Sequence, residues 1–248
     1  MSSDIFSVDP LQLYMGYDYK INDKIIIHQP KMRDITNVGE QEYFSMVYTI
    51  CANPTDMKVK LWDIGIDWCE IEDFDLFMML AQSMTQERTK LLFGDLDLSK
   101  MKQYRNKENG EIMLADPETG VKIDRLIYMR IVDYVRKMHK IKPTPVKHAK
   151  NKYTKQAMLD YARQQEDLHA KEGYKSHLVP TISALQCRMG WTKDYILDMG
   201  IVEYFEVVSR TQIINEADHL LSGVYAGTVD LKKVKNGNEK LNWMREIT

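Results

Sequence analysis

The chain has 248 residues, 44% of them hydrophobic and 28% charged, which is ordinary globular usage with enough apolar residues to bury a core. Its formal net charge of −2 gives the whole chain no electrostatic attraction for nucleic acid or for an anionic membrane. It has no run of about 18 apolar residues and no apolar signal segment at its start, so we expect a cytoplasmic protein without a membrane span.

The three cysteines, Cys51, Cys69 and Cys187, are widely spaced and have apolar neighbours. An odd number without paired spacing favours reduced, buried thiols over disulfides or a zinc site.

The start of the chain predicts an arm and then a hairpin. Residues 1–16 show no clear period. Residues 17–20 and 24–28 are rich in β-branched and aromatic side chains and flank the turn Ile21-Asn22-Asp23, which is typical of a β-hairpin.

Apolar residues at helical spacing then predict helices over 34–51, 57–64 and 73–84. The first should bury one face, made of Tyr43, Phe44, Val47, Tyr48 and Cys51. Gly65 should end the second, because glycine adopts the left-handed conformation at little cost.

A second hairpin is predicted from the strand-like segments 94–104 and 111–115, joined across the turn 106–110 and followed by another turn at 116–120. The spacing of Ile123, Ile127, Ile131, Tyr134 and Met138 predicts a helix over 123–138.

Between Arg136 and Lys155 the chain has eight Lys or Arg residues and no acid, with Pro143 and Pro145 in the middle. The prolines exclude a continuous helix, and the uncompensated charge resists burial. We therefore predict an α+β N-terminal domain over 1–138, a basic linker or loop over 139–153, and a helical C-terminal domain with an extended tail over 154–248.

The C-terminal half is predicted to be helical over 154–170, 180–189, 193–199 and 201–221. The first of these should bury a stripe of Ala157, Met158, Tyr161 and Leu168. Gly190 and Gly200 should end the next two, and Thr192 should cap the start of the third. In the tail, Leu241, Trp243 and Met244 should form an apolar anchor.

The expected fold is therefore α+β and mostly helical, with two small antiparallel β-hairpins in the N-terminal half and an all-α C-terminal half. Trp62-Asp63-Ile64-Gly65-Ile66 and Leu197-Asp198-Met199-Gly200-Ile201 resemble each other. A glycine-stopped helix corner used twice explains five positions more simply than a duplication does.

No catalytic, cofactor-binding or metal-binding residues are predicted. The acidic residues Glu70, Glu72, Asp73 and Asp75 lie at a helix start, where negative charge favours the helix dipole. The six histidines show no pair at i, i+4 and no cysteine at metal-ligand spacing, and the chain has no phosphate-binding loop and no nucleophile elbow. We expect a protein that is not an enzyme.

The glycine-linked helices around Gly190 and Gly200 have the outline of a helix-turn-helix. The segment 201–209, however, carries Glu203 and Glu206 and no base-reading Arg, Lys, Asn or Gln before Ser209, so nucleic-acid binding is not expected. The 16 methionines suit an irregular core, and as a set they also suit a surface that repacks around partners.

The segment from Arg188 to Met199, with Gly190-Trp191-Thr192 near its start and Tyr204-Phe205 after it, resembles a helical segment of tail assembly chaperones of tailed bacteriophages. The segments 19–25, 61–68 and 221–230 are similar to tail-module proteins of phages of Gram-positive hosts. The resemblance implies an assembly factor in the host cell cytoplasm that binds the tape-measure protein, and with it the tail-tube protein as a further partner.

On this hypothesis the expected partner-binding residues are Trp191, Tyr204, Phe205, Trp243 and Met244. The alternative is a structural component of the virion, in the tail or baseplate, with the hairpins offering strand edges to neighbouring subunits.

Overall fold

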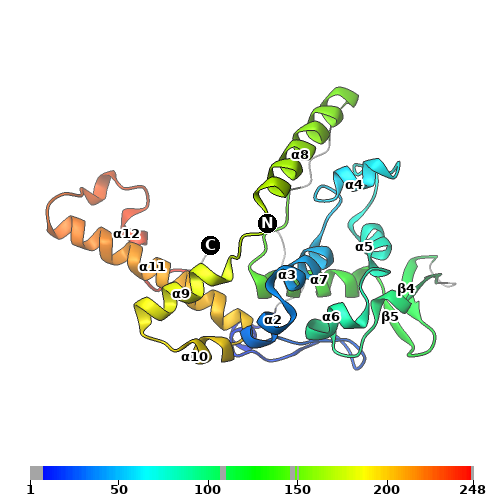
Figure 1. The fold of residues 1–248 in the computed structure, drawn as a ribbon, viewed down its shortest axis with the longest axis horizontal. Helices are drawn as coiled ribbons and strands as arrows, with labels where there is room; N and C mark the ends of the chain where they lie inside the picture. Colours follow the sequence, from blue (N-terminus) through cyan, green and yellow to red (C-terminus); the bar gives the residue numbers. More distant parts are fainter. Residues whose placement is uncertain (1–7, 107–109, 146–148, 150, 247–248) are drawn as a thin grey trace.

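The structure is a computed structural model that describes residues 8–106, 110–145, 149 and 151–246. It is mostly helical, with two small antiparallel sheets in the N-terminal half and a helical C-terminal half, which confirms the predicted fold class. In Figure 1, α8 projects from the main body on one side, and the end of α11 with α12 extends on another.

The helices of the described residues are, in chain order, α1 (Pro10–Tyr14), α2 (Met32–Val38), α3 (Glu40–Cys51), α4 (Lys58–Asp63), α5 (Asp73–Ala81), α6 (Gln86–Phe93), α7 (Arg125–His139), α8 (Lys152–Glu172), α9 (Leu178–Met189), α10 (Lys193–Asp198), α11 (Ile201–Tyr225) and α12 (Gly237–Lys240). The strands are β1 (Tyr19–Lys20), β2 (Ile26–Ile27), β3 (Lys102–Arg105), β4 (Ile112–Asp116) and β5 (Val121–Ile123).

The first predicted hairpin is confirmed. Tyr19 of β1 pairs with Ile27 of β2 in an antiparallel ladder. The Asn22 side chain accepts hydrogen bonds of 2.9 Å from the N–H groups of Lys24 and Ile25, so the turn is stabilised by a local Asx interaction.

The second sheet has the order β3-β4-β5 and therefore contains the predicted hairpin together with a strand that was not predicted. Leu114 of β4 lies between Gln103 of β3 and Ile123 of β5. The predicted start of the first strand of this hairpin, at Gly94, is wrong: the strand is β3 and begins at Lys102, and residues 94–101 form a loop with a single 3-10 turn at Leu98–Lys100. The centre of the predicted turn, residues 107–109, lies outside the described residues.

Side-chain caps set several helix starts. Asp124 accepts a hydrogen bond from the N–H of Ile127 at 2.8 Å and starts α7, and Thr192 caps α10 as predicted. Asp9 caps α1, so residues 10–14 of the expected arm are helical; residues 1–7 lie outside the described residues.

The helix predicted over 34–51 is instead two helices, α2 and α3, that meet at Gly39. Gly39 has φ of 104°, a backbone conformation that side chains rarely allow, and it ends α2 and starts α3 in a new direction. The helix α6 was also not predicted, because residues 86–93 carry little helical periodicity of their own.

The main core lies among α3, α7 and the start of α11, with the hairpins and α5 packed around it. Ile131, Val135 and Met138 of α7 are fully buried, and Val47 of α3 and Ile201 of α11 meet them in the same cluster. This cluster draws residues from both ranges of the predicted domain division, which itself stays a prediction.

The N-terminal and C-terminal parts of the chain are also joined through the backbone. The N–H of Met32 donates to the carbonyl of Met199 at 2.9 Å, and the N–H of Ile201 donates to the carbonyl of Pro30 at 3.0 Å. Arg33 adds ion pairs to Asp194 and Asp198. These contacts fix α2 against α10 and the start of α11.

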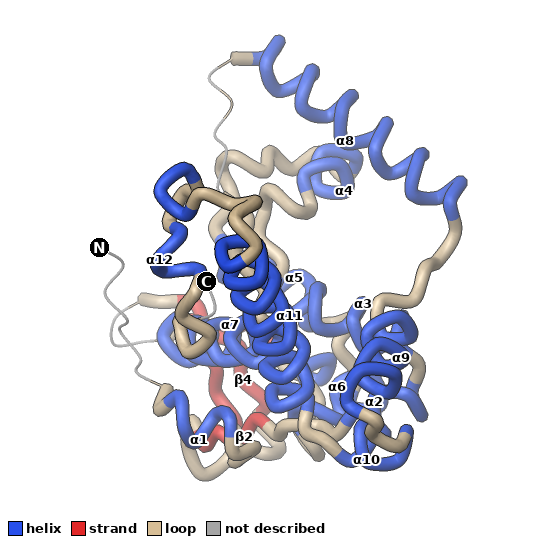
Figure 2. The backbone as a smooth tube through the Cα atoms, turned by 90° about the vertical axis from the view of Figure 1, so that its left-hand side faces the viewer, coloured by secondary structure: helices blue, strands red, loops and turns tan. Residues whose placement is uncertain are grey.

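Helix α8 docks on α4 rather than on the main core, and Figure 2 shows it beside α4. Its one fully buried side chain is Leu159, which belongs to a small cluster with Val59, Leu61, Trp68 and Leu76. Lys155 pairs with Asp67, and Arg163 pairs with Asp63.

The predicted buried stripe of α8 is wrong. Ala157, Tyr161 and Leu168 are exposed and Met158 is half-buried, because α4 is short and meets only the face that carries Leu159 and Ala162. Cys187 also departs from prediction: it is exposed, whereas Cys51 is buried and Cys69 is half-buried.

The C-terminal segment folds back along α11 mainly through polar contacts, so the expected apolar anchor is not what holds it. Arg210 donates to the carbonyls of Trp243 and Arg245, both at 2.8 Å, and Glu216 pairs with Lys240 and Arg245. Trp243 and Met244 are themselves exposed.

The two glycine corners that look alike in sequence differ in conformation. Gly65 has φ of 79° and follows the end of α4, whereas Gly200 has φ of −67° and serves as the N-cap of α11. The sequence similarity therefore does not extend to the backbone at the two glycines.

Candidate functional site

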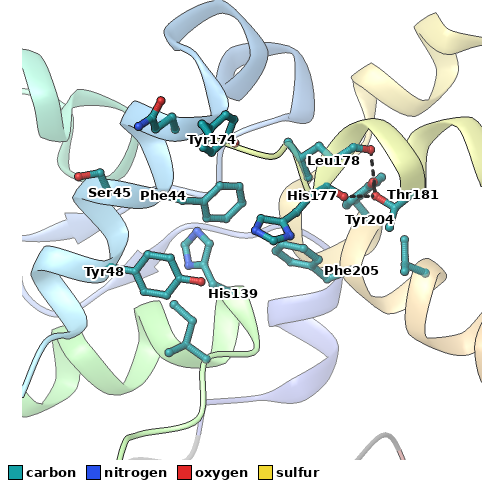
Figure 3. Close-up of a pocket in the computed structure, with 13 residues that line it drawn as sticks. Phe44, Ser45, Tyr48, His139, Tyr174, His177, Leu178, Thr181, Tyr204 and Phe205 are labelled. Carbon is teal, nitrogen blue, oxygen red and sulfur yellow. Dashed lines mark hydrogen bonds between the residues drawn. The ribbon is translucent and has the colours of Figure 1, made fainter. Parts of the chain in front are cut away.

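An open apolar pocket of about 480 Å³ lies where α3, the end of α7, the start of α9 and the first turns of α11 meet (Figure 3). Its volume lies within the roughly 300–1,000 Å³ range of protein ligand sites. We call it the apolar pocket; its lining residues are Gln41, Phe44, Ser45, Tyr48, His139, Ile141, Tyr174, His177, Leu178, Thr181, Tyr204, Phe205 and Val208.

Helix α3 supplies one wall through Gln41, Phe44, Ser45 and Tyr48, which recur at three- and four-residue spacing and so share a face. The adjacent face of the same helix, with Tyr43 and Val47, is buried in the main core. Phe44 contacts His139 edge-on and also approaches Phe205 of α11. Aromatic side chains from three helices thus meet in the pocket.

A buried hydrogen-bonded pair supports the floor of the pocket. His139 is 6% exposed, its Nδ1 lies 2.8 Å from the carbonyl of Val135, and its Nε2 lies 2.7 Å from the hydroxyl of Tyr43. Burial lowers the pKa of His139 to about 4 and raises the pKa of Tyr43, so both groups are neutral. Nδ1–H therefore donates to Val135, and Nε2 accepts from Tyr43.

The start of α9 is fixed by the carboxylate of Glu40, from the first turn of α3. Glu40 accepts hydrogen bonds from the N–H groups of His177 and Leu178, at 2.7 and 3.0 Å, and from the hydroxyl of Ser176. Partial burial alone would raise the pKa of Glu40, but these hydrogen bonds lower it overall. The carboxylate thus satisfies N–H groups that a helix start leaves without partners.

Two further contacts hold α11 beside the pocket. Lys140 adopts a left-handed conformation at the end of α7, and its Nζ donates to Glu206 at 2.8 Å and to Ser209 at 3.1 Å. The hydroxyl of Thr181 on α9 is hydrogen-bonded to that of Tyr204 (Figure 3). The pocket walls are therefore held together by side chains of the lining itself and by side chains next to it.

Of the sequence-predicted partner-binding residues, Tyr204 and Phe205 line this pocket. Tyr204 is 1% exposed and belongs mainly to the core, whereas Phe205 is half-buried. Trp191 is half-buried against Tyr195 and lies outside the lining, and Trp243 and Met244 are exposed on the C-terminal segment. The five residues do not form one surface, and their role in partner binding stays a prediction.

Sequence reasoning did not identify the contribution of α3. Phe44 and Tyr48 were expected on a buried face, but Tyr48 is 59% exposed at the pocket rim. The helical spacing of apolar residues alone could not distinguish the face of α3 that packs in the core, with Tyr43 and Val47, from the neighbouring face that lines the pocket. The signal that distinguishes them is the polar pair Gln41 and Ser45 on the pocket side.

Two polar groups of the lining, the His139 ring and the Thr181 hydroxyl, form hydrogen bonds within the protein. Among the described residues there is no group of three or more His, Cys, Asp or Glu side chains that could hold a metal ion. No described helix is both long enough and apolar enough to cross a membrane.

Comparison of the chain with protein-family models, with curated proteins and with solved structures gives no match.

Proposed function

We propose that this chain is a non-enzymatic tail assembly chaperone of a tailed bacteriophage, which binds the tape-measure protein during tail morphogenesis in the host cytoplasm. The observation that supports this proposal is the apolar pocket. A helix of a partner can place large apolar side chains into such a pocket at i, i+3 and i+4 spacing.

The rim of the pocket adds to this support. Tyr48 and Tyr174 line it and are 59% and 51% exposed. Aromatic rings at the edge of a concave apolar surface are typical of protein-binding sites, because they supply large contact areas with little side-chain entropy to lose.

Co-expression tests the proposal. The tape-measure protein of the same phage should move from the insoluble to the soluble fraction when the chain is present, and the two should co-purify. No increase in soluble tape-measure protein would contradict the proposal.

Substitutions connect the activity to the pocket. Tyr48→Asp and Val208→Asp each place a charge on the lining and should reduce co-purification at least tenfold. Tyr153→Asp and Tyr225→Asp are the matched controls, because these tyrosines are 88% and 83% exposed and lie outside the pocket. Equal loss in all four variants would show that the pocket is not the binding site.

A structural role in the tail or baseplate is the alternative, and β3 favours it. This strand forms one edge of its sheet, and all four of its residues are exposed. An open edge can pair with a strand of a neighbouring subunit, although Lys102 and Arg105 oppose indiscriminate pairing. Mass spectrometry of purified particles separates the two functions, because a structural component is present in stoichiometric amounts and a chaperone is absent.

A further inference from the structure

A second pocket, of about 730 Å³, adjoins the apolar pocket between the C-terminal part of α3, α4, α6 and the residues that follow α7. We call it the basic pocket, because four cationic side chains line it: Lys60, Arg88, Arg136 and Lys142. Among its described lining residues, Asp56 is the one carboxylate. Its oxygens already accept hydrogen bonds from the Thr144 hydroxyl, at 2.6 Å, and from the Asn53 N–H, at 3.0 Å.

Two of the cations have internal partners. Arg88 pairs with Glu42 at 3.0 Å. Arg136 donates to the carbonyl of Cys51 at 2.6 Å and lies near Asp73, while its Nε is buried without a hydrogen-bond partner among the described residues.

The other two cations remain available to a ligand. Lys60 and Lys142 are exposed, and neither forms an ion pair with a carboxylate in the described part of the chain. They come from α4 and from the segment after α7, so the fold brings together charges that are far apart in sequence. The basic pocket thus offers positive charge that internal acids do not neutralise.

The two pockets adjoin each other, since Ser45, Tyr48 and Ile141 line both. Helix α3 forms a shared wall, from Gln41 on the apolar side to Thr49 on the basic side, a distance of about 12 Å along the helix axis. A partner helix of two to three turns matches this length.

We propose that the two pockets form one binding groove, and that it takes a segment of a partner protein in which an apolar helical stretch ends in acidic side chains. The apolar residues fill the apolar pocket, and the carboxylates reach Lys60 and Lys142. This inference rests on the proposed function, because it names the chemistry of the segment that the chaperone binds.

The groove favours a protein segment over nucleic acid. A phosphate backbone gains affinity from a row of cations along its path. Here the surface next to the cations is aromatic and apolar, and the acid Glu42 already pairs with Arg88 of the lining.

Fluorescence anisotropy with the full chain tests the proposal. The probes are labelled helical peptides of about 14 residues with one Leu and Phe face, carrying three Glu or three Lys at one end; versions with the charges at either end cover both directions of binding. The better acidic peptide should bind at least tenfold more tightly than its lysine counterpart. Equal affinities, or tighter binding of the lysine peptide, would overturn the proposal.

Reversing the charge of the two lysines tests whether the preference for the acidic peptide comes from the groove. Lys60→Glu combined with Lys142→Glu should weaken binding of the acidic peptide at least tenfold and should invert the preference between the two peptides. Lys122→Glu combined with Lys152→Glu is the matched control, since both lysines are exposed and outside the groove. An identical loss in the control pair would contradict the assignment, as would tight binding of a short single-stranded RNA in place of either peptide.

The outcomes separate this inference from the proposed function. If the Lys60→Glu/Lys142→Glu variant co-purifies with the tape-measure protein as well as the unchanged chain does, the groove assignment fails and the chaperone function stands. If the unchanged chain does not co-purify with the tape-measure protein but prefers the acidic peptide, the chaperone function fails while the groove keeps its specificity.

Discussion

At the scale of single residues, the buried pair of His139 and Tyr43 makes the stability of the folded protein depend on pH. The imidazole is neutral and buried, and both of its nitrogens are hydrogen-bonded inside the protein. Protonation in place would put a charge into the main core and remove the acceptor that Tyr43 needs. The folded protein therefore resists protonation of His139 far below the pH at which an exposed histidine titrates.

We expect the free energy of unfolding to fall as the pH drops from about 6.5 to about 4. The pKa of His139 is about 4 in the folded state and about 6.5 in an unfolded chain, so the unfolded state takes up the proton first. The contribution is present in full above pH 6.5 and decreases by up to about 3 kcal/mol across this interval. Urea unfolding at a series of pH values measures it.

His139→Phe should flatten this pH dependence, whatever its effect on stability at pH 7. The control is His169→Phe, because His169 is exposed on α8. An unchanged slope in His139→Phe would show that other groups cause the loss of stability in acid.

At the scale of elements, the sequence predicts the helices and strands that have a strong apolar period and a cap or turn residue close by in the chain. Helix α7 is of this kind, with Asp124 at its start and apolar residues at regular spacing, and so is the first hairpin with Asn22 in its turn. The strand β5 has only three residues, too few to show an alternating apolar pattern. It forms by pairing with β4, where Ile123 lies opposite Leu114. Gly39 was missed because the residues on both sides fit a helical period.

The same limit applies to the apolar pocket. Tyr204 and Phe205 stand out in the sequence as adjacent aromatics. The roles of Tyr48, Ile141 and Leu178 depend on how α3, the end of α7 and α9 pack around them, and no local pattern encodes that arrangement.

Helix α8 should be able to undock from α4 while the main core stays folded. Leu159→Asp places a charge in the small cluster beside α4 and should undock α8 while the main core stays folded. Hydrogen exchange should then become faster in 152–172 and stay unchanged in α3 and α7. Tyr161→Asp, at a residue 65% exposed on the same helix, should leave α8 protected; equal exchange in both variants would contradict this arrangement.

At the scale of the whole molecule, the main core joins segments from the two ends of the chain. Leu178, Ile196, Ile201 and Tyr204 from the C-terminal half are buried in one cluster with residues of α2, α3 and α7 of the N-terminal half. Removing the C-terminal half would expose a large apolar surface on the N-terminal half. Burial of such surface is the main favourable contribution to the free energy of folding.

A fragment of residues 1–145 should therefore fail to unfold cooperatively and should bind a hydrophobic dye, whereas the full chain should show a cooperative transition of its main core. Adding a fragment of residues 151–248 should restore the transition. Independent cooperative unfolding of the 1–145 fragment would instead support the domain division predicted from the sequence.

The hydrogen bonds between Pro30 and Ile201 and between Met32 and Met199 join residues that the ribosome adds at very different times. These partners are about 170 positions apart, which at a typical elongation rate separates their translation by roughly 10 to 30 seconds. The first hairpin and α2 leave the ribosome long before the residues that complete their contacts. The nascent chain must therefore keep an unfinished apolar surface free of aggregation until α10 and α11 emerge.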